Sequence, residues 1–203
     1  TARQIKGENV YYDAYNSAIF IPDSGGVEVY HKTKLVPGVE KMPFPKLLDP
    51  LAKLAVSLGG TSGSLGKENY NNPFTIDGIV INPLICYESI YGDKKSDNSD
   101  LVAIITNDGW WKNSAGYKQH SSYARLRAIE QKKAIIRSAN TGISSIITLS
   151  GAIEKQSKWG NKQTIKATIP IIKTKTFYSI YGDYIGRIST FIFSLLFLIA
   201  LVK

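Results

Sequence analysis

Two uninterrupted apolar segments in the middle of the chain constrain its fold more than any other feature. The first, GIVINPLICYE, covers residues 78–88, and the second covers residues 101–106. A strand that is apolar without alternation is buried on both faces, as it is at the centre of a sheet covered by helices. Both segments end in polar or aromatic residues. We therefore expect an α/β fold in which the ends of the central strands carry the ligand or nucleophile positions.

The segments on either side of these strands complete the pattern. The expected elements are, in chain order, a hairpin of strands 12–21 and 27–35 around the turn PDSGG, a loop over 37–75 broken by a short helix at 45–58, a helix over 119–138, a hairpin over 142–155 and a strand over 164–173. Turn residues between apolar runs predict the hairpins, and apolar residues at helical spacing predict the helix. Strands that alternate with helices and are flanked by hairpins are typical of a layered α/β domain.

Composition narrows the class of protein. Hydrophobic residues make up 43% and charged residues 20%, which is enough apolar surface for a folded core. The net charge of +9 favours anionic partners, such as acidic lipid headgroups. No dense Lys/Arg stretch accompanies a nucleic-acid motif, so we expect no nucleic-acid partner. The single cysteine, Cys86, excludes an internal disulfide and a Cys/His zinc cluster, and we expect no cofactor.

The chain ends in an apolar segment that resembles a membrane span. Residues 188–202 carry no charge and would form a helix of about 22 Å, and starting at Tyr184 lengthens it to about 28 Å, close to a hydrocarbon core of about 30 Å. Arg187 can snorkel to the interface, and Tyr178 and Tyr181 suit an aromatic belt. We expect a membrane helix, with a buried terminal helix as the alternative.

The beginning of the chain indicates a longer parent protein. Thr1 opens a polar stretch without the pattern of a signal peptide. We expect a domain over 1–183 that lacks its N-terminal part, followed by a transmembrane helix over 184–203.

Three places could carry chemistry. Cys86 ends a buried strand, where a thiolate could act as a nucleophile, although a lone cysteine can also be an inert core residue. Lys32 lies at a strand exit, eight residues before Glu40, and could stabilise a thiolate and an oxyanion, or could be a solvated surface lysine. Residues 107–111, NDGWW, could cap an apolar pocket or could simply pack in a core.

Other cysteine or metal chemistry fits the sequence less well. A papain-like dyad needs a histidine, and the two histidines are His31 and His120. His31 neighbours Lys32 on a strand, so its side chain points to the opposite face. His120 has no companion at metal-ligand spacing.

Four ordered segments, YHKTKLVPGVEKMP, ICYES, ITNDGWW and HSSYARLRAIEQKKAIIRSANTGIS, together resemble the nitrilase superfamily. Within it the chain is most similar to the apolipoprotein N-acyltransferases, whose loops contain comparable Cys-Tyr-Glu and Asn-Asp-x-Trp motifs. The resemblance covers roughly residues 10–202. It implies an α-β-β-α layered sandwich, incomplete at its N-terminus, followed by one transmembrane helix.

The resemblance also implies a Glu-Lys-Cys catalytic set that transfers an acyl chain. Cys86 would accept the chain from a phospholipid as a thioester and pass it to the N-terminal diacylglyceryl-cysteine of an apolipoprotein. Lys32 would stabilise the oxyanion. Glu40 and Glu88 would position Lys32 and the cysteine turn, and Tyr87 and Trp110 would shield the thioester from water. The expected location is the bacterial inner membrane, with the catalytic domain on the periplasmic side of a multi-pass parent.

The general-base glutamate of the family has no counterpart that we can assign. Glu8 lacks an apolar strand before it, so we expect the base to lie outside this chain and the activity to belong to the parent protein. Two other functions stay open at this point. One is a nitrilase-type amidase acting on a small amide, and the other is a non-catalytic, membrane-tethered binding domain.

Overall fold

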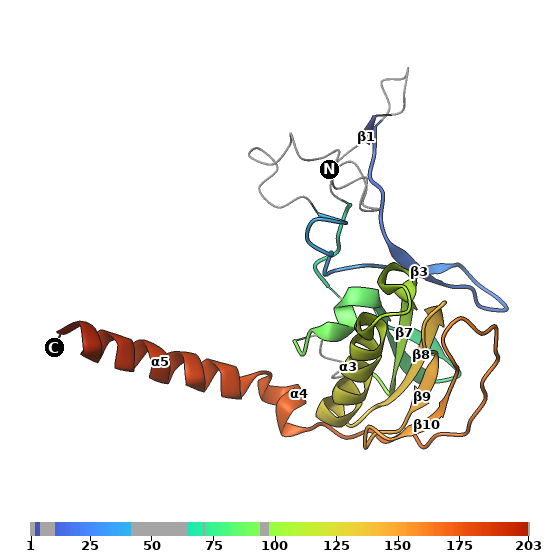
Figure 1. The fold of residues 1–203 in the computed structure, drawn as a ribbon. Helices are drawn as coiled ribbons and strands as arrows, with labels where there is room; N and C mark the ends of the chain where they lie inside the picture. Colours follow the sequence, from blue (N-terminus) through green and yellow to red (C-terminus); the bar gives the residue numbers. More distant parts are fainter. Residues whose placement is uncertain (1–2, 5–10, 42–64, 71, 94–97, 203) are drawn as a thin grey trace.

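A six-stranded mixed sheet forms the centre of the computed structural model, which describes residues 3–4, 11–41, 65–70, 72–93 and 98–202 (Figure 1). In the sheet order β10-β9-β8-β7-β6-β5, the strands are β10 (Ile153–Gln156), β9 (Ser145–Ile147), β8 (Ala134–Asn140), β7 (Leu101–Asn107), β6 (Ile79–Ile85) and β5 (Phe74–Ile76). β6, β7 and β8 are parallel, and the outer pairs are antiparallel. Both expected central strands and the second expected hairpin are confirmed.

The parallel strands bring two short 3₁₀ helices to one edge of the sheet. β6 and β7 stay in register up to the pair of Ile85 and Ile105. β6 continues directly into η2 (Cys86–Ile90), and β7 into η3 (Asp108–Trp111). The cysteine and the NDGWW loop therefore leave the sheet at the same carboxyl edge, which is where open α/β sheets place their ligands.

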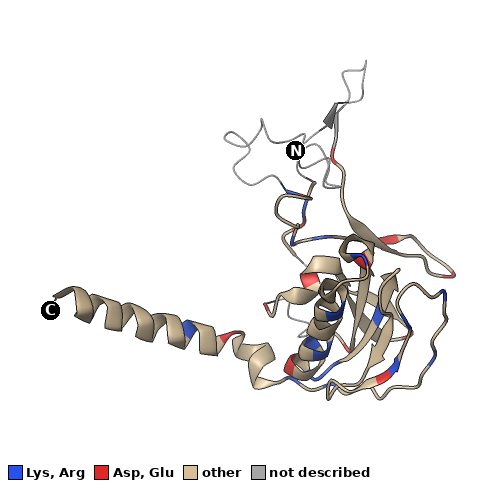
Figure 2. Ribbon diagram, viewed as in Figure 1, with Lys and Arg blue, Asp and Glu red and all other residues tan. Residues whose placement is uncertain are grey.

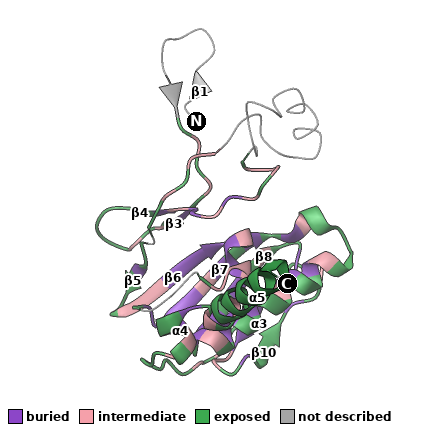
Figure 3. Ribbon diagram, turned by 90° about the vertical axis from the view of Figure 1, so that its left-hand side faces the viewer, coloured by how far each residue is buried: buried purple, intermediate pink, exposed green. Residues whose placement is uncertain are grey.

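One face of the sheet is covered by α3 (Ala115–Gln131) (Figure 1). The core between them contains seven buried apolar residues: Leu84, Val102, Ile104, Ala124, Ala128, Ile135 and Ile147. Ala124 and Ala128 lie one turn apart on the helix, and their small side chains allow α3 to approach the strands closely. Figure 3 shows the resulting buried residues along β6 and β7.

A separate hairpin packs against the sheet near β5 and β6. It consists of β3 (Ser17–Phe20) and β4 (Glu28–His31), paired antiparallel, and confirms the first expected hairpin over a shorter length. Its buried residues Ala18 and Tyr30 form a second core cluster with Phe74 and Ile85. The cluster is made of four residues from four strands, so the exit of β4 is fixed next to the exit of β6. One further short pair joins β1 (Arg3–Gln4) to β2 (Tyr11–Tyr12).

The expected helix over 119–138 is confirmed up to Gln131 and is wrong beyond it. α3 ends at Gln131, Lys132 adopts left-handed backbone angles (φ 51°, ψ 42°), and residues 134–140 form β8. Ile135 and Ile136 suit a helix by spacing, but they are β-branched and pair with β7 along the whole strand. Tertiary pairing thus outweighs the local helical pattern.

Two other expected elements differ or cannot be compared. Residues 164–173 belong to no strand, although Lys155 and Lys133 donate from Nζ to carbonyls of this segment. Pro170 has no N–H for a strand ladder, which is consistent with this irregular path. The expected helix over 45–58 lies outside the described residues.

The chain leaves the domain through two helices. α4 (Phe177–Tyr181) is separated from α5 (Tyr184–Val202) by Gly182, whose φ of 68° breaks the helix. α5 is the one helix of the described residues that is long and apolar enough to cross a membrane, and none of it is buried. It extends away from the sheet (Figure 1), carries no charged residue after Arg187 (Figure 2) and is exposed along its length (Figure 3).

The left-handed residue after α3 gives a direct test of the helix end. Lys132→Gly removes the steric cost of a Cβ at positive φ, which is about 1 kcal/mol. We expect the variant to raise the free energy of unfolding by about that amount, measured by denaturant titration of the full-length protein. Lys132→Ala keeps the Cβ and serves as the control. A gain as large in the alanine variant would contradict the assigned helix end.

Candidate active site

Cys86 lies at an abrupt turn of the backbone. Ile85, the last residue of β6, is still extended (φ −101°, ψ 110°), whereas Cys86 has a left-handed φ of 51°. Non-glycine residues rarely adopt a positive φ, and they do so mainly where surrounding contacts enforce it, often at functional sites. The thiol is half-buried. This strand-to-helix turn has the form of a nucleophile elbow, which presents a side chain above the edge of the sheet.

Glu88 joins this elbow to the exit of β4. The carboxylate is fully buried, and its Oε2 accepts from the backbone N–H of Ile85 at 2.8 Å. Its Oε1 accepts from the N–H and the hydroxyl of Thr33, at 2.8 and 2.7 Å, and from the N–H of Lys34 at 3.2 Å. The Tyr30 hydroxyl lies 2.9 and 2.8 Å from the two oxygens. One carboxylate thus binds both strand exits, which are far apart in sequence.

Tyr30 remains a hydrogen-bond donor in this cluster. Burial raises the pKa of its hydroxyl, and the nearby negative charge of Glu88 raises this pKa further. Tyr30 and Thr33 flank Lys32 on either side, and both contact Glu88. The backbone that carries Lys32 is therefore held relative to the cysteine elbow.

Lys32 is itself fully buried and paired with Glu40. Its Nζ donates to the two carboxylate oxygens of Glu40 at 2.9 and 2.8 Å, and its side chain is 1% exposed. Glu40 also accepts from Asn16 Nδ2 and from the N–H of Val36, both at 2.8 Å. A buried charge persists only when it is paired and hydrogen-bonded, and here the carboxylate is also held in place by two further donors. Lys32 is therefore not a solvated surface lysine.

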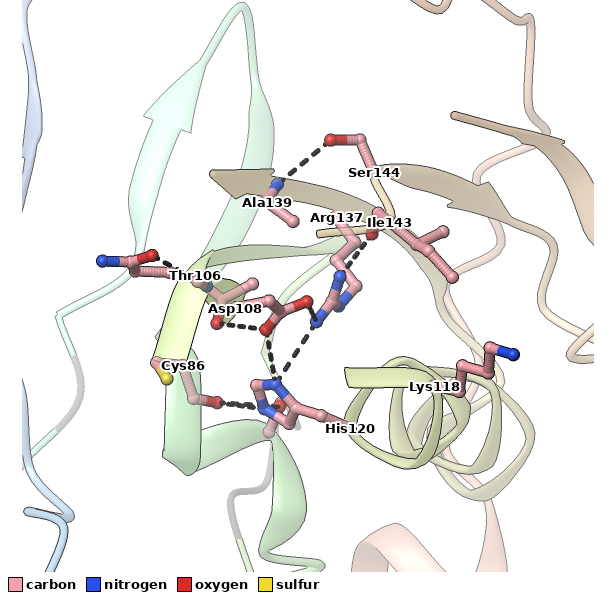
Figure 4. A network of polar contacts seen from close by, with 12 residues as sticks. Cys86, Thr106, Asp108, Lys118, His120, Arg137, Ala139, Ile143 and Ser144 are labelled. Carbon is pink, nitrogen blue, oxygen red and sulfur yellow. Dashed lines mark hydrogen bonds and ion pairs between the residues drawn. The ribbon is translucent and has the colours of Figure 1, made fainter. Parts of the chain in front are cut away.

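A second buried network lies on the α3 side of the elbow (Figure 4). Asp108, the first residue of η3, accepts from Arg137 Nη2 at 2.7 Å and lies 2.9 Å from His120 Nδ1. His120 Nε2 lies 3.2 Å from the backbone carbonyl oxygen of Cys86, and Ser89 Oγ donates to the same oxygen at 2.8 Å. The network therefore joins β8, η3 and α3 to the peptide that carries the cysteine.

Asp108 is charged in this network. Burial by itself raises the pKa of its carboxyl, but the hydrogen bond with His120 and the positive charge of Arg137 outweigh burial, so the pKa lies below its ordinary value. Gly142 leaves room for this carboxylate, because a Cβ there would lie 2.2 Å from Asp108 Oδ2.

Tyr87 and Trp110 have less defined surroundings than the residues above. The ring of Tyr87 meets that of Tyr91 edge-on, with centroids 5.2 Å apart. A hydrogen bond with Tyr87 and burial raise the pKa of Tyr91 to about 12. Trp110 is 57% exposed, whereas Trp111 packs over Gly116 at the start of α3.

The structure brings together several residues that the sequence analysis named and adds others to them. Cys86, Glu88, Lys32 and Glu40 lie in one connected cluster, and the catalytic roles expected for them stay predictions. Asp108 was named only as part of the NDGWW loop, Ser89 and Arg137 were given no role, and His120 was considered only as a dyad partner or metal ligand. The available signal was Asp108 directly after an apolar strand, beside the same sheet edge as the cysteine.

The fold agrees with the comparison to known proteins. The model of the carbon-nitrogen hydrolase family matches residues 3–177, and the chain belongs to this family. Among solved structures, the carbon-nitrogen hydrolase of Helicobacter pylori superposes with a TM-score of 0.52 at 12% identity, covering 76% of this chain and 55% of that chain. The glutamine-dependent NAD+ synthetase of Acinetobacter baumannii gives 0.55 at 15% identity, covering 80% and 29%. These matches confirm the nitrilase-like α/β fold.

Sequence relatives narrow the similarity to one branch of the family. The apolipoprotein N-acyltransferase of Chlorobaculum tepidum is 32% identical over 201 residues, which is 95% of this chain and 38% of that protein. The enzyme of the same name from Rickettsia typhi is 37% identical over 163 residues, 76% of this chain and 31% of that protein. The chain thus spans about a third of the length of these relatives.

The buried carboxylate of Glu88 gives the sharpest stability test. Glu88→Gln replaces one acceptor oxygen by an NH₂ group, so at least one buried donor loses its partner. We expect a loss of about 2–3 kcal/mol in the free energy of unfolding, measured by denaturant titration. Glu28→Gln, an exposed carboxylate on β4, is the control and should change little. Equal stability of the two variants would contradict the structural role of Glu88.

The charge of Asp108 predicts a pH dependence. Its folded-state pKa lies below the ordinary value of 3.8, so it stabilises the fold above that pH, and the contribution is lost as the pH falls through the folded pKa. Asp108→Asn should therefore be less stable than the natural protein at pH 7, and the difference should shrink below about pH 3.8. Thermal unfolding at several pH values measures this. A difference that is independent of pH would contradict it.

Proposed function

We propose that this chain carries the thioester-forming site of an apolipoprotein N-acyltransferase. The observation that carries the proposal is the shared carboxylate of Glu88, which binds the backbone beside Lys32 and the elbow of Cys86. It keeps an ammonium group and a thiol on neighbouring strand exits, as a cysteine acyltransferase needs. The names of the relatives support an acyl chain as the transferred group.

The first half-reaction forms the thioester. A glutamate outside the chain accepts the proton of Cys86, and the thiolate attacks the ester carbonyl of a phospholipid. Lys32 Nζ and the backbone N–H of Tyr87 stabilise the oxyanion that develops. The ester C–O bond then breaks, the lysophospholipid leaves with the proton, and the acyl chain stays on the sulfur.

The second half-reaction uses the α-amino group of a diacylglyceryl-cysteine apolipoprotein. The amine attacks the thioester carbonyl, the C–S bond breaks and an amide forms. The proton of the amine returns to the sulfur of Cys86, so the thiol is regenerated. Tyr87 and Trp110 would shield the thioester between the two steps, because hydrolysis is the competing reaction. Glu40 would hold Lys32 in place, and Glu88 would hold the elbow.

The terminal helix supports a reaction at a membrane. α5 would anchor the catalytic domain, residues 1–183, through a span over 184–203, with Arg187 at the interface. The domain would belong to a multi-pass protein and would lie on the periplasmic side of the inner membrane. Both substrates are lipids or lipidated proteins, so such an anchor keeps the cysteine close to them.

Acylation of the cysteine tests the proposal. Full-length protein in membranes is incubated with acyl-labelled phospholipid, and the hydroxylamine-sensitive label on the protein is measured. We expect the natural protein to be labelled and Cys86→Ala to carry no label. Label that persists in Cys86→Ala would overturn the nucleophile assignment, and a natural protein without label would overturn the proposed reaction.

The lysine is tested by turnover. Lys32→Ala removes one oxyanion donor, and we expect acyl transfer to fall by about 10²–10³-fold. Lys41→Ala, an exposed lysine of the same loop, is the matched control and should retain normal transfer. Equal activity of both variants would contradict the role of Lys32.

A further inference from the structure

We propose that His120, held by Asp108 and Arg137, sets the orientation of the peptide between Cys86 and Tyr87 and so directs the Tyr87 N–H toward the substrate. The inference rests on the proposed function, because it explains how that oxyanion donor is held. It makes His120 a positioning residue, which acts through the backbone of the nucleophile without contacting the reacting atoms.

The first observation is that the Cys86 carbonyl is held from the α3 side. Ser89 Oγ donates to this oxygen at 2.8 Å, and His120 Nε2 lies 3.2 Å from it. Ser89 and His120 also contact each other at 3.2 Å, and both are buried. In Figure 4 the carbonyl of Cys86 points to the imidazole, while the sulfur points away from it.

The geometry of the peptide bond then determines where the N–H of Tyr87 points. The described residues contain no cis peptide bond, and in a trans peptide the C=O and the N–H point in opposite directions. Because the Cys86 carbonyl points toward His120, the N–H of Tyr87 points away from α3. Rotation of this peptide would turn the N–H away from the substrate and put a carbonyl oxygen in its place. Such a carbonyl would repel an oxyanion.

The third observation is how firmly the imidazole is held. Asp108 Oδ1 lies 2.9 Å from His120 Nδ1 and accepts from the Thr106 hydroxyl at 3.2 Å, while Asp108 Oδ2 accepts from Arg137 at 2.7 Å. The side chains of Asp108 and Arg137 are fully buried. Arg137 donates in addition to the carbonyl of Ile143.

This network fixes the direction of the ring. An ionised carboxylate can only accept, so Nδ1 of His120 carries a proton and Nε2 faces the elbow. A proton on Nε2 lets the ring donate to the Cys86 carbonyl, and Ser89 gives its single hydroxyl proton to the same oxygen. The imidazole and the serine then hold the carbonyl together. The buried ion pair of Asp108 and Arg137 thus acts on the elbow through the imidazole of His120 and not through the thiol.

The experiment compares two reactions of the same thiol in the full-length protein. Acylation, by phospholipid and independently by a p-nitrophenyl ester, develops an oxyanion, whereas alkylation by iodoacetamide does not. His120→Met removes the ring and offers no donor to the carbonyl, whereas the amide of His120→Gln can still donate to it. We expect His120→Met to slow acylation by about 10²-fold and His120→Gln to recover most of that loss. Alkylation should stay within about threefold in both.

A second variant covers the case in which His120→Met does not fold. Ser89→Ala removes one donor to the Cys86 carbonyl and leaves the Asp108–Arg137 pair intact, so we expect about tenfold slower acylation with normal alkylation. Ser122→Ala, on the exposed side of α3, is the matched control and should acylate normally.

Two results would overturn the inference. One is acylation at the natural rate in His120→Met, or in Ser89→Ala where His120→Met does not fold. The other is an equal loss of acylation and alkylation, which would show a general disturbance of the thiol. Acylation by the p-nitrophenyl ester tests the role of His120 independently of the proposed phospholipid reaction. A natural protein that reacts with the p-nitrophenyl ester but not with phospholipid would contradict the proposed function and would still allow the ratio of the two reactions to be compared among the variants.

Discussion

The hydrogen bonds of Glu88 are the constraint on which the rest of the site depends. β4 and β6 belong to different sheets, and packing of Tyr30 and Ile85 brings them together only approximately. The carboxylate of Glu88 fixes the orientation of the two strand exits relative to each other, because its two oxygens accept from the backbone N–H of Thr33 on one side and of Ile85 on the other. A buried carboxylate without these donors would cost several kcal/mol, so the fold and the alignment of the two strand exits stabilise each other.

The elbow is held from two opposite sides by different means. On the hairpin side, Glu88 binds backbone donors and fixes the position of the strand exits. On the α3 side, His120 and Ser89 contact a single carbonyl and fix the direction of one peptide. The left-handed φ of Cys86 is unfavourable for a cysteine, and contacts on both sides explain how it persists. Buried polar groups around Cys86 thus stabilise the strained backbone of the proposed nucleophile.

The sequence predicted the parts of the structure that depend on local pattern. Residues 79–85 and 101–107 form central strands, as their apolar runs predicted, although Ile105 is 48% exposed. Cys86 follows at the sheet edge. The end of α3 was missed because Ile135 satisfies both a helical and a strand pattern, and only pairing with β7 decides between them. The network around His120 was missed for a related reason. Its partners lie 12 to 34 residues away, and no spacing rule reveals that α3 folds over the end of β6.

We propose that the two strand exits bring Lys32 Nζ and the Tyr87 N–H to one point beside the sulfur of Cys86. The most direct test is an experimental structure of the full-length protein with the acyl group on the cysteine, in which the thioester carbonyl oxygen is located. We predict that this oxygen lies about 3 Å from both nitrogen atoms. An oxygen that contacts neither of them, and faces water or the Trp110 loop, would contradict the proposed oxyanion site.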